Sequence, residues 1–248
     1  MSIGVLTPYK GLRCKICDGG TSILGVKDFN RSCEEERGRQ VFPPIGHAVY
    51  YHKCGNCGFI FTSDLDDWNV DDYIKNIYNE DYIKVDPDYS GKRSKDFVTW
   101  MSPMLNGDKS ITLLDYGAGN DTCSAELKKQ GYNAVGWDPM WQTEPTFAKD
   151  STFDVVTAFE VLEHTPTPLE TLKEIIGFVK PEAGQIVFST LVNDIIGDAG
   201  SEYWYLSPRN GHVCMHSQKS LSIMFDKLGM EVQSFSPSQH VASWKERS

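Results

Sequence analysis

The chain has 248 residues, of which 40% are hydrophobic and 12% aromatic, and its formal net charge is −10. This length accommodates one α/β domain and a small module, with enough apolar residues for a sizeable core. No window concentrates lysine and arginine, which argues against a nucleic-acid partner. Apolar runs such as residues 184–192 have strand length and are too short to span a membrane. Residues 1–17 lack the pattern of a secretory leader, so we expect a cytoplasmic protein.

Four of the seven cysteines form two C-x-x-C pairs, Cys14 with Cys17 and Cys54 with Cys57. Each pair can direct two thiolates at one point, and two such turns complete the tetrahedral site typical of structural zinc. A redox pair is the alternative, but neither pair lies in a β-α-β context. We therefore predict that these four cysteines hold a structural zinc ion, with His47 and His52 as alternative ligands.

The rest of the N-terminal third predicts short elements and a linker. Residues 29–47 combine mixed charge with two prolines, as an exposed insertion does. Residues 48–63 predict two short strands around the second cysteine pair. Residues 64–83 are acidic and aromatic at near-helical spacing, so we expect a helix that packs on the next domain. Residues 84–95 have the composition of a linker. The predicted domains are a zinc-binding module, residues 1–90, and a larger domain, residues 91–248.

From residue 111 onward, predicted strands and helices alternate. The strands are expected at residues 111–117, 133–138, 153–159, 184–192 and 230–236. The helices, placed by apolar spacing and capping residues, are expected at residues 121–131, 167–180 and 217–229. This alternation predicts a mostly parallel sheet with helices on both faces, and such sheets bind ligands at the carboxyl ends of their strands.

The sequence LLDYGAGNDT runs from the first of these strands into the first helix. Gly117 and Gly119 match two glycines of the dinucleotide fingerprint, but the third position is Thr122. Without that glycine, and with Asp121 at the helix start, a pyrophosphate is disfavoured at the helix N-terminus. Asp138 follows the next strand, 19 residues after Gly119, where a carboxylate can accept hydrogen bonds from ribose hydroxyls.

LLDYGAGND, VGWDP and FDVVTAFEVLEHTPTP resemble the successive motifs of class I S-adenosylmethionine-dependent methyltransferases, over about residues 111–236. CGFIFTS, YNEDYI and YWYLSPRNGHVCMHS extend the resemblance to a subgroup with an N-terminal four-cysteine zinc module. That subgroup is similar to sugar C-methyltransferases and quinone-type O-methyltransferases. The resemblance implies a Rossmann-like α/β sheet with an antiparallel last strand, S-adenosylmethionine as cofactor, and a small-molecule acceptor such as a sugar or nucleotide-linked sugar.

The resemblance also implies roles for single residues. Asp115, Gly117 and Gly119 would contact the methionine end of the cofactor. Asp138 would hold the ribose. At the end of the strand 153–159, the residues that would face the methyl-bearing sulfur are Phe159 and Glu160. Their neighbours in the same predicted cofactor set are Tyr116, Ala118 and Pro139.

The stretch between Asp138 and Asp154 is too short for a complete helix and strand. We expect a loop in place of the helix, with a short strand at residues 145–149. The adenine contacts stay open, and the candidates are Trp137, Trp141, Phe147 and Asp150.

Methyl transfer requires a positioned nucleophile and, where a proton must leave, a base with a pKa near neutrality, for which histidine is suited. His212 is the first candidate base, since the similar sugar methyltransferases carry a histidine in this segment; a hydrogen bond to the loop backbone is its alternative role. His164, which closes EVLEH, is the second candidate and otherwise a wall of the site. Tyr205 completes the predicted catalytic set. The residues expected to shape the acceptor pocket are Tyr203, Trp204, Tyr205 and Arg209.

Two other functions are compatible with parts of the sequence. An NAD-dependent oxidoreductase would use the same glycine turn but lacks the third glycine. A non-catalytic binding protein could use the zinc module for recruitment, although the complete set of cofactor residues argues against it. The sequence gives no indication of the oligomeric state.

Overall fold

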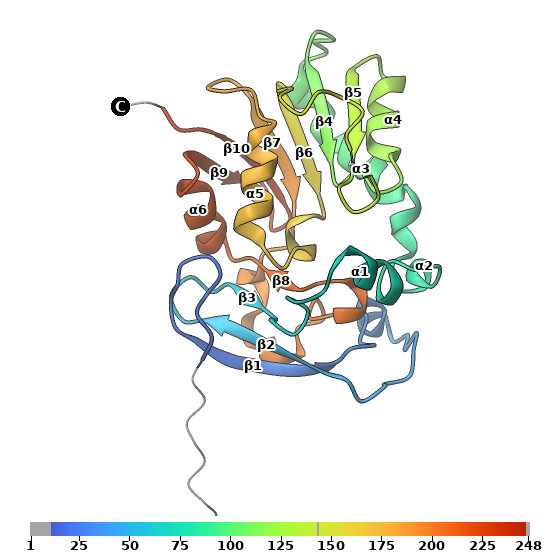
Figure 1. The fold of residues 1–248 in the computed structure, drawn as a ribbon, viewed down its shortest axis with the longest axis vertical. Helices are drawn as coiled ribbons and strands as arrows, with labels where there is room; N and C mark the ends of the chain where they lie inside the picture. Colours follow the sequence, from blue (N-terminus) through green and yellow to red (C-terminus); the bar gives the residue numbers. More distant parts are fainter. Residues whose placement is uncertain (1–10, 143, 247–248) are drawn as a thin grey trace, which may run out of the picture.

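The structure is a computed structural model that describes residues 11–142 and 144–246 (Figure 1). The prediction about a secretory leader falls largely on residues 1–10, which lie outside the described residues. Within the described part of the chain, none of the helices has the length and apolar character needed to cross a membrane.

A six-stranded sheet forms the frame of the larger part of the molecule. In chain order its strands are β4 (Thr112–Tyr116), β5 (Asn133–Trp137), β6 (Val155–Phe159), β7 (Gln185–Ser189), β9 (Met230–Ser234) and β10 (Gln239–Trp244). They lie in the order β5-β4-β6-β7-β10-β9, with parallel pairing from β5 to β7 and antiparallel pairing of β10 with both neighbours. The predicted mostly parallel sheet with an antiparallel last strand is confirmed.

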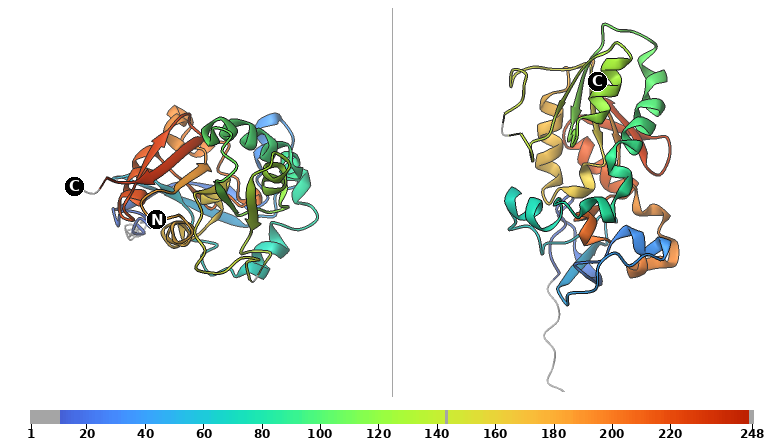
Figure 2. Two further views of the ribbon diagram at one scale, coloured as in Figure 1. Left: turned by 90° about the horizontal axis from the view of Figure 1, so that it is seen from above. Right: turned by 90° about the vertical axis from the view of Figure 1, so that its right-hand side faces the viewer.

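Helices cover both faces of this sheet, as predicted. They are α3 (Lys92–Met101), α4 (Thr122–Lys129), α5 (Pro168–Gly177) and α6 (Gln218–Asp226). In β6, Val156 and Ala158 pack in the core with α5 and α6, whereas Val155 packs on the other face with α3 and α4. Figure 2 shows α5 in gold and α3 and α4 in green on opposite sides of the sheet. Burial on both faces explains why the strands read as continuous apolar runs.

A smaller antiparallel sheet, in the order β1-β2-β3-β8, lies beyond the carboxyl ends of the large sheet's parallel strands (Figure 1). Its strands are β1 (Thr21–Asp28), β2 (Ala48–Cys54), β3 (Ile60–Phe61) and β8 (Cys214–Met215). The two strands predicted around the second cysteine pair are therefore present. β8 comes from the C-terminal half of the chain and pairs Met215 with Ile60. The small sheet therefore draws on both halves of the chain, and the division at residue 90 stays a prediction.

The segment between the two sheets differs from the prediction. The single helix expected at residues 64–83 is divided into α1 (Val70–Asn76) and α2 (Tyr82–Val85). The predicted linker at residues 84–95 is wrong, because it folds into the 3-10 turn η2 (Pro87–Ser90) and the start of α3. A bidentate ion pair between Arg93 and Asp86, at 2.6 and 2.9 Å, joins this turn to the helix.

Residues 138–142 and 144–152 form the predicted loop, but the short strand expected at 145–149 is absent from the residues described there. The remaining 3-10 turns are η1 (Cys33–Arg37), η3 (Ser102–Leu105), η4 (Leu162–His164), η5 (Asn193–Ile195), η6 (Gly197–Glu202) and η7 (Pro208–Asn210). The turn η4 comes shortly after β6 in the chain, so it lies at the edge where parallel sheets bind their ligands.

Candidate active site

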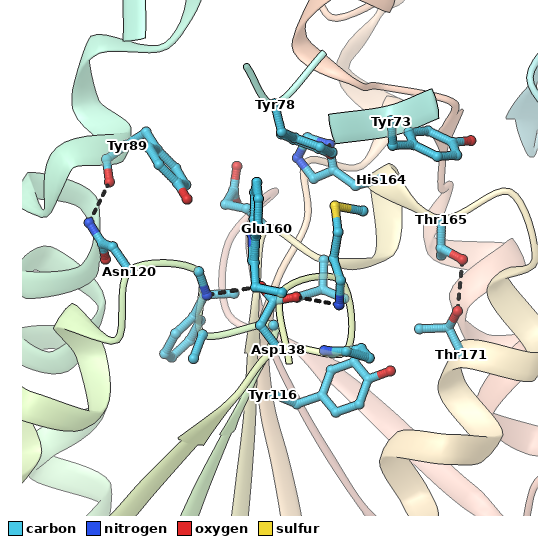
Figure 3. A pocket seen from close by; sticks show the side chains of 18 of the residues that line it. Tyr73, Tyr78, Tyr89, Tyr116, Asn120, Asp138, Glu160, His164, Thr165 and Thr171 are labelled. Carbon is cyan, nitrogen blue, oxygen red and sulfur yellow. Dashed lines mark hydrogen bonds between the residues drawn. The ribbon is translucent and has the colours of Figure 1, made fainter. Parts of the chain in front are cut away.

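A cavity of about 400 Å³ lies at the carboxyl ends of β4, β5 and β6 (Figure 3). Its sheet side is formed by the turns that follow these strands, through Tyr116, Gly117, Ala118, Gly119, Asp138, Pro139, Phe159 and Glu160. The rest of its wall is largely aromatic and comes from residues 68–97, which precede the large sheet in the chain, through Trp68, Tyr73, Tyr78, Tyr82, Tyr89 and Phe97. Eight of the nine residues predicted to bind the cofactor therefore line one cavity.

The turn after β4 depends on glycine. Gly117 and Gly119 have φ of +73° and +53°, in the left-handed region that side chains disfavour. The Gly117 N–H donates to the Trp137 carbonyl at 2.8 Å, which fixes the turn against the end of β5. A Cβ on Gly117 would lie 2.6 Å from Val161 Cγ2. The turn is therefore held close to the neighbouring strand ends.

The missing third glycine has a counterpart elsewhere. Asp121, the N-cap of α4, has φ of +61°, and its carboxylate accepts a hydrogen bond from Ser124 Oγ. This carboxylate occupies the space beside Gly136, where a Cβ would lie 2.0 Å from Asp121 Oδ1. Gly136 in β5 thus permits the close approach of helix to strand, and an acid rather than an anion-binding surface stands at the start of α4.

Asp138 lies at the end of β5 and lines the cavity (Figure 3). Its two oxygens accept the Gly119 and Met140 N–H groups, each at 2.9 Å. Burial raises the pKa of this carboxyl. A carboxylate has about four acceptor positions, so each oxygen retains capacity for a ligand hydroxyl.

Asp115 is the predicted cofactor residue that does not line the cavity. It is 4% exposed, accepts a hydrogen bond from Thr157 Oγ1 at 2.7 Å, and lies in the sheet beneath the glycine turn. Burial raises its pKa to about 7. The structure therefore places this carboxyl under the turn rather than at its surface.

The end of β6 carries local backbone strain. Glu160 has φ of +53°, and its carboxylate accepts from Ser189 Oγ of β7 at 2.6 Å. Burial, together with the neighbouring Glu163, raises the pKa of Glu160 to about 7. Phe159 stacks on Phe97 of α3, with 4.5 Å between ring centroids. Unfavourable backbone at a buried carboxyl that lines a cavity is typical of a functional position.

His164 is the predicted catalytic residue that lines the cavity. Its Nδ1 lies 3.1 Å from the Tyr78 hydroxyl and 3.1 Å from the Gly211 carbonyl oxygen. A carbonyl oxygen only accepts, so we assign the ring proton to Nδ1, which leaves Nε2 as the basic nitrogen. Burial lowers the pKa of this imidazole, which is therefore neutral at neutral pH.

His212 and Tyr205 lie behind His164 rather than beside the cavity. The His212 ring is 5.1 Å from that of His164, and its Nδ1 is 2.9 Å from the Tyr205 carbonyl oxygen. Tyr205 donates to Glu163 Oε1 at 2.6 Å. Burial lowers the pKa of His212 well below its usual value. Catalytic roles for these two residues remain predictions, and the loop-backbone alternative for His212 matches the bond that it makes.

The loop at residues 203–213 does not line the cavity. Its aromatic side chains instead pack in the hydrophobic core that also contains residues of β2 and α1. Arg209 illustrates this: its guanidinium donates to the Ile77 carbonyl at 2.7 Å and to Asn79 Oδ1 at 3.0 Å. Its expected roles, binding an acceptor anion or pairing with a surface acid, are not what the structure shows.

Sequence reasoning missed part of the cavity wall. Tyr82 comes from α2, Tyr89 and Arg93 from the segment predicted as a linker, and Phe97 from α3 just after that segment. Tyr89, an aromatic residue between two helices, was the one sign that this segment could line a site. The proline, the glycine and the charged residues around it are instead typical of a linker. Among the adenine candidates only Trp141 lines the cavity, whereas Trp137 and Phe147 pack in the core.

The four paired cysteines converge at a second place. All their Sγ atoms lie within 4.8 Å of one another, with 3.6 Å between Cys14 and Cys57 and 3.5 Å between Cys17 and Cys54. Sulfurs at about 2.3 Å from a tetrahedral zinc ion are about 3.8 Å apart, so the donor set fits zinc. Neither of the two alternative histidine ligands belongs to this cluster.

Replacing Gly117 with alanine is expected to weaken binding of S-adenosylhomocysteine more than about tenfold. The left-handed backbone costs a side chain about 1–2 kcal/mol, and the new Cβ would press on Val161. Calorimetric titration measures the change. Gly177→Ala, at the end of α5 with open space around it, is the matched control and should bind normally. Equal affinity of both variants would contradict a ligand role for the turn.

Comparison with known proteins places this geometry in context. Residues 89–234, more than half of the chain, match the model of the family described as methyltransferase domain. A ubiquinone biosynthesis O-methyltransferase of Aliivibrio fischeri (strain MJ11) is 31% identical over 113 residues, covering 36% of this chain and 48% of that protein. A protein of the same name from Vibrio cholerae is 44% identical over 121 residues, covering 40% and 49%. The chain thus spans about half the length of these curated relatives.

Among solved structures, 1,6-didemethyltoxoflavin-N1-methyltransferase of Burkholderia thailandensis has a TM-score of 0.51 at 13% identity, covering 82% of this chain and 96% of that one. This likeness supports the fold described above. The family model covers the glycine turn, Asp138 and the η4 histidine, so the sheet side of the site lies within the matched region, whereas the lining residues Trp68, Tyr73, Tyr78 and Tyr82 precede it. The chain belongs to the methyltransferase domain family.

Proposed function

We propose that this protein transfers a methyl group from S-adenosylmethionine to a small-molecule acceptor. The observation that carries the proposal is the convergence of the glycine turn, Asp138 and Glu160 at one cavity beside a neutral histidine. Asp138 would accept hydrogen bonds from the ribose, and the Gly117–Gly119 turn would pack against the methionine end. The acid at the start of α4 disfavours the pyrophosphate of NAD.

When bound, S-adenosylmethionine supplies an electrophilic methyl carbon on a sulfonium. The protein then needs to align the acceptor and remove its proton. His164 Nε2 is suited to take that proton, because Nδ1 is fixed by the Gly211 carbonyl. Glu160, held by Ser189, would favour the positively charged imidazole that results. The aromatic wall would exclude water from the reacting groups.

We propose a ring-bearing acceptor with a hydroxyl or an acidic C–H, such as a sugar or a phenol. The wall of six aromatic side chains provides faces on which either ring can pack. Arg93 is the cation among the described lining residues, and both of its terminal nitrogens bind Asp86. A nucleotide-linked sugar would therefore need to keep its phosphates outside this cavity. The relatives named ubiquinone biosynthesis O-methyltransferases are, by that name, enzymes that methylate oxygen, so we would test a hydroxyl acceptor such as a phenol first.

We further propose that the four cysteines hold a structural zinc ion. Four thiolates complete a tetrahedral site and leave no open position for substrate, which is the arrangement of structural rather than catalytic zinc. The cluster packs beneath α6, in the same core as Leu221 and Phe225. Its contribution would therefore be to join the small sheet to the methyltransferase domain.

Calorimetry with S-adenosylmethionine, S-adenosylhomocysteine and NAD tests the proposed cofactor. The first two are expected to bind and NAD is not. Asp138→Asn should weaken S-adenosylhomocysteine about 10- to 100-fold, since hydrogen bonds to a charged group contribute about 1.5–3 kcal/mol. Asp96→Asn, at an exposed site of α3 that does not line the cavity, is the control. Failure of both sulfur ligands to bind, or binding of NAD alone, would refute the proposal.

A further inference from the structure

Tyr78 lies between α1 and α2, on the opposite side of the cavity from the sheet (Figure 3). Its ring packs edge-on against Tyr82 and His164, with centroid distances of 5.1 and 6.2 Å. Its hydroxyl is 3.1 Å from His164 Nδ1. Tyr78 therefore comes from the segment that connects the two sheets and contacts His164 of the methyltransferase domain.

The Gly211 carbonyl determines which group donates in the hydrogen bond between Tyr78 and His164. The Gly211 carbonyl oxygen, 3.1 Å from the same Nδ1, accepts the ring proton. The Tyr78 oxygen is therefore a second acceptor of that N–H, and its own proton is not consumed by His164. Among the described residues, the Tyr78 hydroxyl makes no other hydrogen bond. Since the residue lines the cavity, this O–H is available to a bound acceptor.

The position of Tyr78 is fixed from two sides. Arg209, which is 4% exposed, donates to the residues on either side of it, at the Ile77 carbonyl and Asn79 Oδ1. On the other side, a Cβ on Gly211 would lie 2.7 Å from the Tyr78 oxygen and 3.0 Å from His164 Nδ1. Gly211 has φ of +85°, so both backbone and space demand glycine where these groups meet. The buried Arg209 thus holds the backbone on both sides of Tyr78, which fixes the position of the tyrosine in the cavity wall.

We propose that Tyr78 is a catalytic residue whose O–H donates to the acceptor oxygen while its oxygen accepts the Nδ1–H of His164. The inference rests on the proposed methyl transfer. The acceptor O–H bond breaks and its proton passes to His164 Nε2. The acceptor oxygen, carrying negative charge held by the Tyr78 O–H, bonds the methyl carbon as the carbon–sulfur bond breaks onto sulfur. His164 then releases the proton to solvent. For an acidic C–H, the same O–H would hold the neighbouring enolate oxygen.

Tyr78→Phe tests this role with the ring retained, and Tyr203→Phe is the matched control. Tyr203 is buried in the same core, its hydroxyl has no hydrogen-bond partner among the described residues, and it does not line the cavity. The first measurement is the imidazole titration of His164 by NMR with S-adenosylhomocysteine bound. Tyr78→Phe should lower this pKa, because an acceptor for Nδ1–H stabilises the charged ring, and Tyr203→Phe should not.

The second measurement uses 4-nitrophenol as an oxyanion probe, followed by its phenolate absorbance. Tyr78→Phe should weaken phenolate binding about 10- to 100-fold, as loss of a hydrogen bond to a charged group does, whereas neutral nitrobenzene should bind both proteins equally. An unchanged His164 titration and unchanged phenolate affinity in Tyr78→Phe would overturn the inference. Failure of S-adenosylhomocysteine to bind would instead overturn the proposed function.

Discussion

His164→Asn is expected to lower kcat by about 10²- to 10⁴-fold, the range that a general base contributes, while S-adenosylhomocysteine affinity stays within about threefold of wild type. The physical reason is that the η4 turn brings this imidazole to the cavity with its proton fixed on Nδ1. Asparagine can replace the donor to the Gly211 carbonyl but cannot take up a proton at neutral pH. The measurement is S-adenosylhomocysteine release across a panel of phenols and free sugars, paired with calorimetry.

The comparison with His212→Asn decides between the two candidate bases. His212 does not line the cavity and bonds the Tyr205 carbonyl, so its variant should retain much more activity than His164→Asn. His47→Asn, at an exposed histidine, controls for the substitution itself and should match wild type. A larger loss in the His212 variant than in the His164 variant would restore His212 as the base.

The pH dependence of kcat gives an independent signature of the same group. Burial lowers the pKa of His164 below its usual value of 6.5, so protonation of this imidazole should lower the rate only below that value. The charged groups around the ring are Glu160, Asp86 and Arg93, with His212 behind it. Glu160, with a pKa of about 7, takes up a proton first as the pH falls, and losing its negative charge keeps the imidazole neutral longer. If kcat increases with pH and the midpoint of that increase lies well above 6.5, the assignment of His164 as the base would be contradicted.

Local patterns predicted the methyltransferase domain well because its signals are local. Strands buried on both faces are continuous apolar runs, α6 begins at its capping serine, and two C-x-x-C turns imply one metal site. The glycines and Asp138 follow strand ends, which parallel pairing brings to one edge. For the cofactor side of the site, chain order was therefore enough to predict which residues meet.

The acceptor side could not be predicted in this way, because it depends on contacts between distant segments. Residues 84–95 have linker composition, yet the Asp86–Arg93 ion pair folds them against the cavity. Tyr78 meets His164 across 86 residues of sequence. Local patterns also gave no sign that β8 pairs with β3, a pairing that places the loop 203–213 in the core with β2 and α1, and His212 is not among the residues that line the cavity. β10 was also not singled out, since its side chains alternate in burial and half are polar.

Loss of one ligand from the cysteine cluster is expected to destabilise the whole protein. Cys17→Ser should lower the free energy of unfolding by more than about 3 kcal/mol, since structural zinc in small modules contributes about 10–16 kcal/mol. At about 2–4 °C per kcal/mol for a chain of this size, Tm should fall by roughly 6–12 °C or more. Thermal unfolding followed by circular dichroism, with metal analysis of the same samples, measures both effects. The wild type should carry about one zinc ion per chain.

The reason for a global rather than local effect is that both cysteine turns bind the methyltransferase domain. Ser217, the cap of α6, donates to the Cys57 carbonyl, and Lys219 and Lys227 of the same region donate to the Asn56 and Ile16 carbonyls at 2.7 and 2.5 Å. Cys33→Ser is the matched control, because Cys33 is half-buried like Cys17 but lies outside the cluster. It should cost less than about 1.5 kcal/mol. Hydrogen exchange should show β3, β8 and the first turn of α6 losing protection together in Cys17→Ser, because β3 pairs with β8 and Ser217, the cap of α6, binds the Cys57 carbonyl. β8 also follows Gly211 in the chain, whose carbonyl orients His164. A zinc-free protein with unchanged Tm and protected β8 would contradict a structural role for the metal.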